Sequence, residues 1–267
     1  MILHIGMMES IYKYPRTRHI EGSGIQAGDD PQVAPFSELV GKHLVVEEKM
    51  DGANCGISFD RAGRLRLQSR GHYLVGGPRE RQFELLKGWS ARYAADLWEL
   101  LGNRYVLYGE WCYGKHSIFY TDLPHYLLEF DLYDIEDDSF PATERRRVVL
   151  RDAPFINSVR VIHAGPLPSL AALQALVGTS AFIAPDHRAQ LRSAALTAGV
   201  DPAQALSETD PSGCMEGLYI KVEEDGVVSG RYKFVRAGFL QTVLDSGSHW
   251  MDRPLLPNRL RLDASLW

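Results

Sequence analysis

The stretch VVEEKMDGANCGISFD, residues 45–60, decides how the fold and the function are interpreted. It starts as a valine-rich strand, presents Lys49, turns at Asp51-Gly52 and passes Asn54 before an alternating pattern resumes. Lys49 is either an exposed lysine beside an Asp-Gly hairpin turn or a reactive lysine at the end of a strand. A free lysine has a pKa near ~10.4, so a nucleophilic Lys49 requires burial, nearby cations or a metal to lower that pKa. This stretch alone favours the hairpin.

Length and composition predict a folded protein with a substantial core. The chain has 267 residues, of which 45% are hydrophobic and 24% are charged, which suits one large domain or one domain with a smaller appendage. No apolar run approaches the roughly 20 residues of a membrane span. The start MILHIGMMES lacks the basic region and long apolar core of a signal peptide. We therefore expect a soluble cytoplasmic monomer with no membrane partner.

Cysteine usage and net charge exclude several classes of protein. The three cysteines are far apart without C-x-x-C spacing, which argues against a disulfide framework and a zinc knuckle. The formal net charge of -5 means that a nucleic-acid partner cannot be inferred from bulk charge. A local basic region lies at residues 231–267, with six Lys or Arg against three Asp. Within it, Trp250 and the arginines at 253, 259 and 261 fit either contact with single-stranded nucleic acid or packing against a sheet.

The pattern of apolar residues predicts an α+β fold of mostly antiparallel sheets. Turn residues separate short runs of alternating pattern, and strands are expected at 43–49, 54–59, 64–69, 104–111 and 126–135, the first three as a meander. Apolar residues at three-, four- and seven-residue spacing predict a helix over 79–102, ended by Gly102. Ala- and Leu-rich residues 141–212 predict a helical insertion, and 216–236 predict a hairpin around a second Asp-Gly. The chain has no regular βαβ alternation and no glycine-rich P-loop.

Five further short stretches accompany Lys49, and their order changes the interpretation. They are QSRG (68–71), YGEW (108–111), EFDLYD (129–134), EGLYIK (216–221) and RYKFVR (231–236). With Lys49 in motif I, they resemble motifs Ia, III, IIIa, IV and V of the covalent nucleotidyltransferases, which include polynucleotide ligases and capping enzymes. The stretch KYPRTRHIEGSG (13–24) and the sequence GAN ending at Asn54 are similar to the ATP-dependent RNA ligases of the phage RNA ligase 2 type. The resemblance covers about residues 13–236.

The resemblance implies a domain organisation as well as a fold. It predicts the nucleotidyltransferase fold, an ATP-grasp-like ligase core of mostly antiparallel sheets with flanking helices. One adenylation domain is expected over residues 1–236, with the helical insertion at about 141–212, followed by a short tail at 237–267. Many polynucleotide ligases carry a whole further domain after motif V. The 31 residues after Arg236 are too few for one, so no full second domain is expected.

The resemblance assigns catalytic roles to Lys49, Asp51, Glu216 and Lys233. Lys49 Nζ would attack the α-phosphate of ATP and hold AMP as a phosphoramidate. Glu216 would organise Mg²⁺ (or Mn²⁺) through water, since a hard dication prefers oxygen ligands and keeps several waters. Lys233 would contact the α-phosphate. Arg231 lies two residues before it on a strand, points the same way, and stands where these ligases usually have lysine.

A wider set of residues is expected around the nucleotide and the RNA. The expected nucleotide-binding residues are Glu48, Asn54, Arg70, Glu110, Phe130, Lys221 and Arg231. Phe130 would stack on adenine, Glu110 and Arg70 would engage the ribose and a neighbouring phosphate, and Glu48 or its backbone would read the base edge. Contacts with RNA or phosphate are expected from Arg16, Arg18, His19 and Arg236, because arginine binds phosphate in a fork. A core aromatic at 130, a turn residue at 54 and a solvated N-terminal loop are the competing interpretations.

The predicted function is an ATP-dependent RNA ligase that joins 5′-phosphate and 3′-hydroxyl ends through a lysyl-AMP intermediate and an adenylated RNA end. By analogy, a separate polynucleotide kinase or phosphatase would act beside it in RNA repair. Two alternatives stay open. One is a DNA ligase or a capping-type guanylyltransferase, and the other is a non-catalytic module that binds RNA ends.

Overall fold

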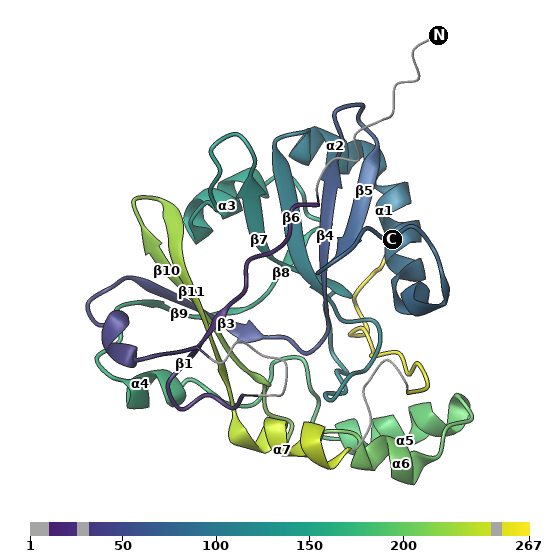
Figure 1. The fold of residues 1–267 in the computed structure, drawn as a ribbon. Helices are drawn as coiled ribbons and strands as arrows, with labels where there is room; N and C mark the ends of the chain where they lie inside the picture. The colour runs from purple at the N-terminus through teal and green to yellow at the C-terminus, as the bar shows by residue number, and fades with distance from the viewer. Residues whose placement is uncertain (1–10, 26–31, 247–252) are drawn as a thin grey trace.

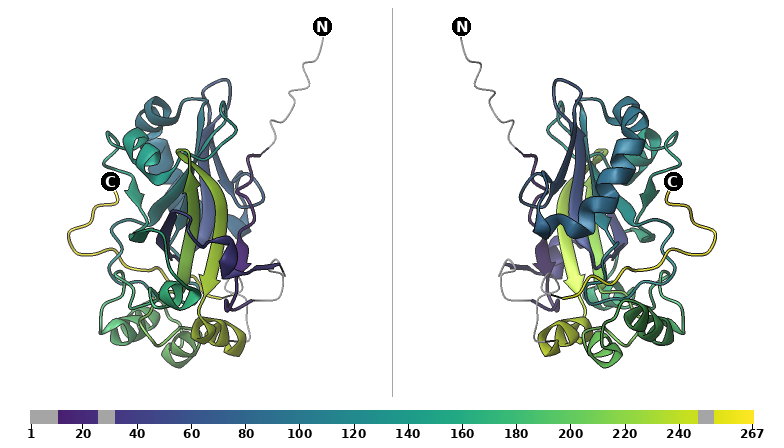
Figure 2. Two further views of the ribbon diagram at one scale, coloured as in Figure 1. Left: turned by 90° about the vertical axis from the view of Figure 1, so that its left-hand side faces the viewer. Right: turned by 90° about the vertical axis from the view of Figure 1, so that its right-hand side faces the viewer.

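Two β-sheets form the centre of the protein, and helices lie around them (Figure 1). The computed structural model describes residues 11–25, 32–246 and 253–267, and every structural statement below concerns these residues. Trp250 lies outside the described residues. Turning the molecule by 90° in either direction shows α1 and α2 against one outer face and the C-terminal segment running along the side of the sheets (Figure 2).

Sheet A has six strands, most of them antiparallel. In spatial order these are β2 (Val33–Ala34), β1 (Arg18–Ile20), β11 (Val227–Val235), β10 (Gly217–Glu224), β3 (Leu44–Lys49) and β9 (Val161–Gly165). Only the pairs that involve β1 are parallel in this sheet. Leu44 and Val46 of β3 pack with Leu218 and Ile220 of β10 in a buried apolar cluster on one face. The other face carries Glu47 and Lys49 of β3, Lys221 of β10, and Arg231 and Lys233 of β11.

Sheet B has five strands and is again mostly antiparallel. Its order is β5 (Leu65–Ser69), β4 (Ala53–Phe59), β6 (Tyr105–Trp111), β7 (Leu127–Asp134) and β8 (Asn157–Ser158). The pair β7–β8 is parallel, and the other pairs are antiparallel. Leu86, Trp89 and Leu97 of the adjoining helices join Ile57 and Leu107 in its core. The predicted α+β class with mostly antiparallel sheets is confirmed.

The opening stretch crosses from one sheet to the other and forms no hairpin. β3 pairs with β10 and β9, whereas β4 pairs with β5 and β6, so the predicted meander is wrong at its first turn. Neither Asp51 nor Gly52 has the positive φ of a type I′ turn. A Cβ on Gly52 would lie 2.8 Å from the Trp111 carbonyl oxygen, so glycine is required for close approach to β6. The second Asp-Gly behaves as predicted: Asp225 (φ 52°) and Gly226 (φ 78°) turn β10 into β11.

The helices differ from the sequence pattern in the region 79–102. Their bounds are η1 Phe36–Glu38, η2 Pro78–Phe83, α1 Glu84–Arg92, α2 Ala94–Leu101, α3 Thr143–Val149, α4 Leu170–Gln174, α5 His187–Thr197, α6 Pro202–Ser207 and α7 Ala237–Asp245. The single helix predicted over 79–102 is divided into η2, α1 and α2, with a break at Tyr93 (φ -95°, ψ 18°). Gly102 ends it as predicted, with φ 49°. No helix in the described part of the chain has the length and apolarity of a membrane span.

Residues 141–212 are less of an insertion than the composition predicts. They contain α3, α4, α5 and α6 as expected, but also β8 and β9. β9 pairs with β3 in sheet A, and β8 pairs with β7 in sheet B. The valines and isoleucines of residues 155–165 suit strands at the sheet edges. This part of the chain therefore supplies one edge strand to each sheet before the helices of residues 170–207 begin.

Candidate active site

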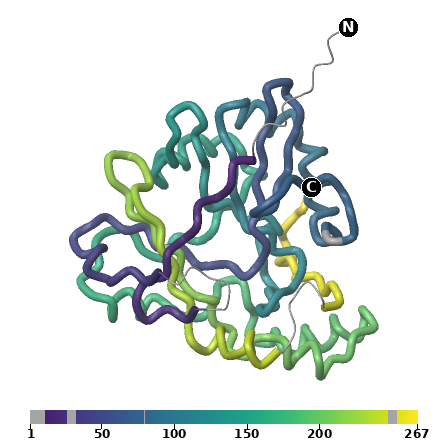
Figure 3. The backbone as a smooth tube through the Cα atoms, in the orientation of Figure 1, coloured from purple at the N-terminus to yellow at the C-terminus, as the bar shows by residue number. Residues whose placement is uncertain are grey.

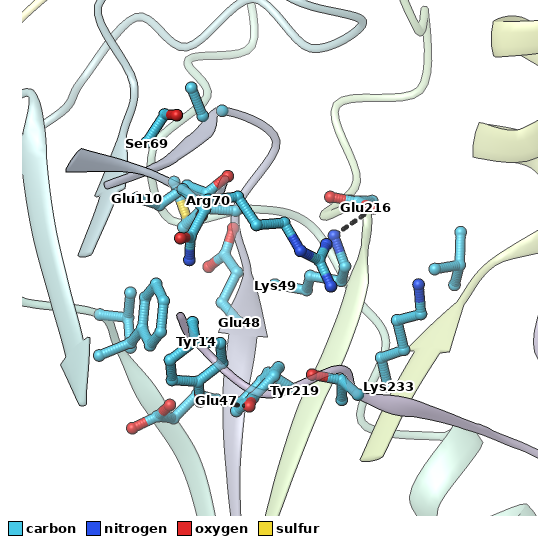
Figure 4. A pocket seen from close by; sticks show the side chains of 18 of the residues that line it. Tyr14, Glu47, Glu48, Lys49, Ser69, Arg70, Glu110, Glu216, Tyr219 and Lys233 are labelled. Carbon is cyan, nitrogen blue, oxygen red and sulfur yellow. Dashed lines mark hydrogen bonds and ion pairs between the residues drawn. The ribbon is translucent and has the colours of Figure 1, made fainter. Parts of the chain in front are cut away.

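A cavity of about 760 Å³ brings together most of the residues that the motifs single out. Its walls come from strands of both sheets and from the N-terminal segment. The predicted residues that line it are Glu48, Lys49, Asn54, Arg70, Glu110, Phe130, Glu216 and Lys233. Figure 4 shows several of them, with Arg70 above Lys49 and with Lys233 on β11, which is separated from the strand of Lys49 by β10. Widely separated motifs thus converge on one site.

Lys49 and Glu216 form an ion pair inside the cavity. Lys49 ends β3, and Gly217, its partner in the register of β10, directly follows Glu216. Lys49 Nζ lies 2.5 Å from Glu216 Oε1, and the two side chains are 24% and 7% exposed. Burial works to lower the pKa of Lys49, but Glu216 and Glu110 outweigh it, so the pKa lies above its ordinary value. The resting lysine is therefore an ammonium ion.

Two carboxylates in the cavity hold protons more tightly than usual. Glu110 lies opposite Asn54 in the β4–β6 pairing, and burial raises the pKa of Glu110 to about 8, against the effect of Lys49. Burial also raises the pKa of Glu216 to about 7, and Asp51 adds to the shift. The second oxygen of Glu216, Oε2, is buried and accepts no hydrogen bond. A cation bound beside these two carboxyl groups would favour their deprotonated forms and lower both pKa values.

An aromatic wall forms another side of the cavity. Phe130 lies edge-on to Tyr14, with ring centroids 5.1 Å apart and an interplanar angle of 80°. Its ring centroid is 6.0 Å from that of Tyr219. All three residues line the cavity, whereas the sequence interpretation named Phe130 alone. Tyr14 lies in the quoted stretch 13–24 and Tyr219 in EGLYIK, so the missing signal was present in segments already singled out.

The face of sheet A that carries the motifs has three rows of residues. The pairing register places Lys49, Gly217 and Val235 in the first row, and Glu47, Tyr219 and Lys233 in the second. Val45, Lys221 and Arg231 form the third row. The side chains of a row point to the same side of the sheet. The first two rows line the cavity, except that Gly217 has no side chain to do so.

The third row lies outside the cavity, so Lys221 and Arg231, which were predicted to bind the nucleotide, do not line it. Lys221 is fully buried, lies 3.0 Å from Glu47 Oε2, and donates to the Phe130 carbonyl oxygen. Arg231 Nε lies 3.3 Å from Asp131 Oδ2, and its guanidinium lies 3.8 Å from the Phe140 ring centroid. Sheet B and its neighbours cover this row. Both cations therefore support the aromatic wall from behind.

Asp51 and Glu48 flank Lys49 in the chain, and of the two only Glu48 lines the cavity. Asp51 does not line the cavity; its Oδ2 accepts hydrogen bonds from the backbone N–H groups of Ser117 and Ile118, each at 2.7 Å. Glu48 is 1% exposed, and its Oε1 accepts a 2.5 Å hydrogen bond from Ser180 Oγ. Its backbone N–H donates to the Arg160 carbonyl. Asp51 and Glu48 thus fix the backbone on either side of Lys49.

The four residues expected to contact RNA or phosphate do not line the cavity. Arg18 pairs with Glu38 at 2.8 Å. His19 is fully buried, with Nδ1 2.7 Å from Ser23 Oγ. Arg236 bonds to the Met215 carbonyl and to Asp210. Arg16 is exposed.

Some of the residues that line the cavity were not predicted from the sequence. The unpredicted lining side chains with polar atoms include Tyr14, Thr17, Glu47, Ser69, His72, Gln82 and Tyr219. Ser69 Oγ lies 3.0 Å from His72 Nδ1 at the rim, beside Arg70.

The contacts of the tail arginines favour packing. Arg253 bonds to the carbonyls of His116 and Glu208, and Arg259 bonds to Gln190. Arg261 is half-exposed and pairs with Asp263.

The fold and the cavity lysine define a nucleotidyltransferase of the ligase type. The sequence profile of the RNA ligase family matches residues 42–235. The chain belongs to the RNA ligase family. Comparison with curated proteins gives no match.

Solved structures of RNA ligases share the fold. One is a lysine-to-alanine mutant of the Naegleria gruberi RNA ligase with ATP and Mn, with a TM-score of 0.51 and 16% identity over 79% of this chain and 54% of that chain. Another mutant of that ligase, without ligand, has a TM-score of 0.51 and 18% identity at the same coverage. A glutamate-to-alanine mutant with ATP and Mn has a TM-score of 0.50 and 18% identity, over 77% and 53%. The chain spans about half the length of these ligases.

Proposed function

We propose that this protein is an ATP-dependent RNA ligase whose nucleophile is Lys49. The observation that carries the proposal is the Lys49–Glu216 ion pair, set in a cavity that also contains Lys233 and an aromatic wall. Membership of the RNA ligase family supports it. The related Naegleria gruberi structures with ATP and Mn support the choice of nucleotide and metal.

The first step transfers AMP to the enzyme. Lys49, after loss of one ammonium proton, attacks the α-phosphorus of ATP; a P–N bond forms and the bond to the β-phosphate oxygen breaks. Pyrophosphate leaves with that electron pair, and AMP stays on Nζ as a phosphoramidate. Lys233 and Arg70 line the same cavity and supply positive charge where negative charge develops on the phosphate. Glu216, 2.5 Å away, is placed to accept the lysine proton.

The aromatic wall suits the adenine ring. Phe130, Tyr14 and Tyr219 line one side of the cavity with their rings at an angle to one another, and an aromatic ring can stack on a nucleobase whatever the base. Asn54 and Glu110 lie side by side on β4 and β6, in reach of the sugar or of a phosphate. The buried Asn54 Oδ1 accepts no hydrogen bond from the protein. These groups position the nucleotide so that its α-phosphate meets Lys49.

The residues present fit a divalent cation bound beside the nucleotide. Glu216 Oε2 is a buried carboxylate oxygen without a hydrogen-bond partner, and the pKa values of Glu110 and Glu216 are raised by burial and by crowding of carboxylates. In the described residues, no group of three or more acidic, histidine or cysteine side chains is arranged to hold a metal. Glu216 would therefore hold Mg²⁺ or Mn²⁺ through water, with Glu110 nearby. Such a cation neutralises phosphate charge and favours the neutral lysine.

Sealing requires two further transfers. The AMP moves from Lys49 to the 5′-phosphate of RNA, and a 3′-hydroxyl then attacks that phosphate and displaces AMP. RNA with a 5′-phosphate and a 3′-hydroxyl is the proposed substrate, and RNA repair the proposed setting. A separate kinase or phosphatase would prepare ends that lack these groups. We propose that the ligase acts as a monomer in the cytoplasm.

The decisive experiment is detection of the lysyl-AMP adduct. The protein is incubated with Mn²⁺ or Mg²⁺ and α-labelled ATP or GTP, and the adduct is measured by intact mass. We expect an increase of one AMP with ATP, none with GTP, and none in Lys49→Ala. Lys42→Ala is the matched control, because Lys42 is an exposed lysine that pairs only loosely with Glu224, at 3.6 Å.

The outcomes separate the alternatives. Absence of an adduct with either nucleotide would reject the enzyme in favour of an end-binding module. An adduct with GTP would indicate a capping-type enzyme. Persistence of the adduct in Lys49→Ala would reject the nucleophile. Nicked duplex RNA, nicked DNA and single-stranded RNA with 5′-phosphates then identify the polynucleotide that the enzyme seals.

A further inference from the structure

The C-terminal segment 253–261 is bound along the loop 112–123 (Figure 3). The Lys115 N–H donates to the Leu256 carbonyl at 2.7 Å, and the Leu123 N–H donates to the Arg259 carbonyl at 3.1 Å. In return, the Arg259 and Arg261 N–H groups donate to the carbonyls of Tyr120 and Leu123. Isolated β-bridges join Gly114 to Pro257 and Leu123 to Leu260. We call the segment 253–261 the strap.

Asn258 is the centre of this contact. Its side chain is 1% exposed. Its Nδ2 donates to the Cys112 carbonyl at 2.8 Å and lies 3.5 Å from the Gly114 carbonyl, and its Oδ1 accepts from the Tyr120 N–H at 2.9 Å. The Asn258 N–H also donates to the Tyr113 carbonyl. One buried side chain therefore satisfies backbone groups at both ends of the loop, and their desolvation would be costly without it.

The same loop holds Asp51 on its other side. Asp51 Oδ2 accepts from the Ser117 and Ile118 N–H groups, each at 2.7 Å. The Asp51 N–H donates to Tyr120 Oη at 2.8 Å. Asp51 is two residues from Lys49, in the crossing between the sheets. A continuous set of hydrogen bonds thus runs from Asn258 through the loop to the backbone that carries the lysine.

We propose that Asn258 is a positioning residue for lysine adenylation, acting through the loop 112–123 and Asp51 on the placement of Lys49. This inference rests on the proposed function of Lys49. The strap contributes no residue to the cavity lining, so its effect is one of geometry. Displacement of a reacting group by about 1 Å can cost ~100-fold in rate. The strap holds the loop to a single position before the nucleotide arrives.

The test uses two substitutions, Asn258→Ala and the near-isosteric Asn258→Asp. The alanine variant removes all three side-chain contacts, whereas Asp keeps the shape and the acceptor and loses the amide donor to Cys112. Both are expected to lower the rate of ligase–AMP formation at saturating ATP by ~10- to 100-fold. The half-saturating ATP concentration is expected to stay within about threefold, since the nucleotide contacts are intact. Amide hydrogen exchange in a peptide covering residues 112–121 is expected to speed up in both variants.

Thr143→Ala is the matched control for lost stability. Thr143 is buried in α3, and its Oγ1 donates a 2.6 Å hydrogen bond to Glu223; within the described residues its side-chain hydrogen bond reaches neither the loop nor the strap. An adenylation rate in the Asn258 variants no lower than in Thr143→Ala would overturn the proposal, as would unchanged exchange in residues 112–121. If the unaltered protein forms no adduct with ATP, the proposed function fails instead. The exchange measurement then still decides whether Asn258 orders the loop.

Discussion

At the scale of single residues, the proposed nucleophile, Lys49, is held in an unreactive form. The ion pair with Glu216 and the nearby Glu110 hold Lys49 as an ammonium ion, because they raise its pKa despite burial. Phosphates of an incoming nucleotide would compete for that ammonium ion, and a cation would compete for the carboxylate. Nucleophilicity would therefore appear only when the substrates are present. The arrangement costs stability, because it buries the carboxyl groups of Glu110 and Glu216.

Glu110→Gln tests how much stability the buried Glu110 carboxyl group costs, because that cost depends on pH. In the folded protein Glu110 keeps its proton up to a pKa of about 8, whereas its ordinary value is 4.5. Between these values unfolding releases a proton, so the free energy of unfolding falls as pH rises and the loss is complete above pH 8. Gln removes this loss. We expect Glu110→Gln to raise the thermal unfolding midpoint, and by more at pH 8 than at pH 5.5, without nucleotide or metal.

Glu38→Gln is the control with the opposite sign. Its hydrogen bond with Arg18 lowers the pKa of Glu38, so the charged form stabilises the fold above its unfolded pKa and the benefit is lost in acid. At pH 8 Glu38→Gln is expected to lower the unfolding midpoint slightly, because the pair is exposed. An equal effect of Glu110→Gln at both pH values would contradict the raised pKa.

At the scale of elements, the same dipeptide has two different structures. Asp225-Gly226 forms the two-residue turn between β10 and β11, with positive φ at both residues. Asp51-Gly52 links the two sheets, where Gly52 lies against the end of β6 and Asp51 binds the loop 112–123. Only the first conforms to the local rule for hairpins. Tertiary contacts determine the second.

Substituting alanine for Gly226 and for Gly52 separates the role of the hairpin turn from that of the link between the sheets. Gly226→Ala places a side chain at φ 78° and is expected to cost about 1–2 kcal/mol of stability with little change in adenylation. Gly52→Ala places Cβ 2.8 Å from the Trp111 carbonyl oxygen and 3.0 Å from Glu110 Cγ, which forces a shift costing about 1–3 kcal/mol. Adenylation is expected to fall in this variant as well. Urea unfolding and adduct formation are measured together, and equal adenylation in both variants would contradict the distinction.

These elements show how far sequence patterns reach. Strand order within the hairpin and the helix end at Gly102 follow from local patterns, whereas only the family resemblance assigned Lys49 and Glu216 to one site. Period-two alternation also places Arg231 and Lys233 on one face, as the register confirms. The alternation does not predict that sheet B covers the row of Lys221 and Arg231. The covering residue, Asp131, lies on a strand that is distant in the sequence. Which residues on one face of a strand line the cavity, and which are covered by the other sheet, depends on tertiary contacts.

At the scale of the whole molecule, buried charges join the two sheets behind the cavity. Arg146 of α3 lies 2.9 Å from Glu47 of sheet A, and 3.5 Å and 3.9 Å from Glu129 and Asp131 of sheet B. Lys221 likewise lies near both Glu47 and Asp131. Lys49, the proposed nucleophile, belongs to sheet A, whereas Glu110 and Phe130 belong to sheet B. The orientation of the sheets therefore sets the geometry of the site.

Arg146→Ala tests whether this network holds the sheets together. The change leaves three buried carboxylates with less positive charge, and burial already raises the pKa of Glu129 against the effect of Arg146. Breaking such a buried network costs about 3–5 kcal/mol, because uncompensated charge stays in a region of low dielectric constant. Arg147→Ala is the control: the neighbouring arginine is 54% exposed and pairs with Glu144 on its own helix, so about 0.5 kcal/mol or less is expected. Urea unfolding measures both, and adding Glu129→Gln to Arg146→Ala is expected to recover part of the loss because it removes one of the unpaired charges. Equal stability of the two arginine variants would show that the sheets are held by apolar packing alone.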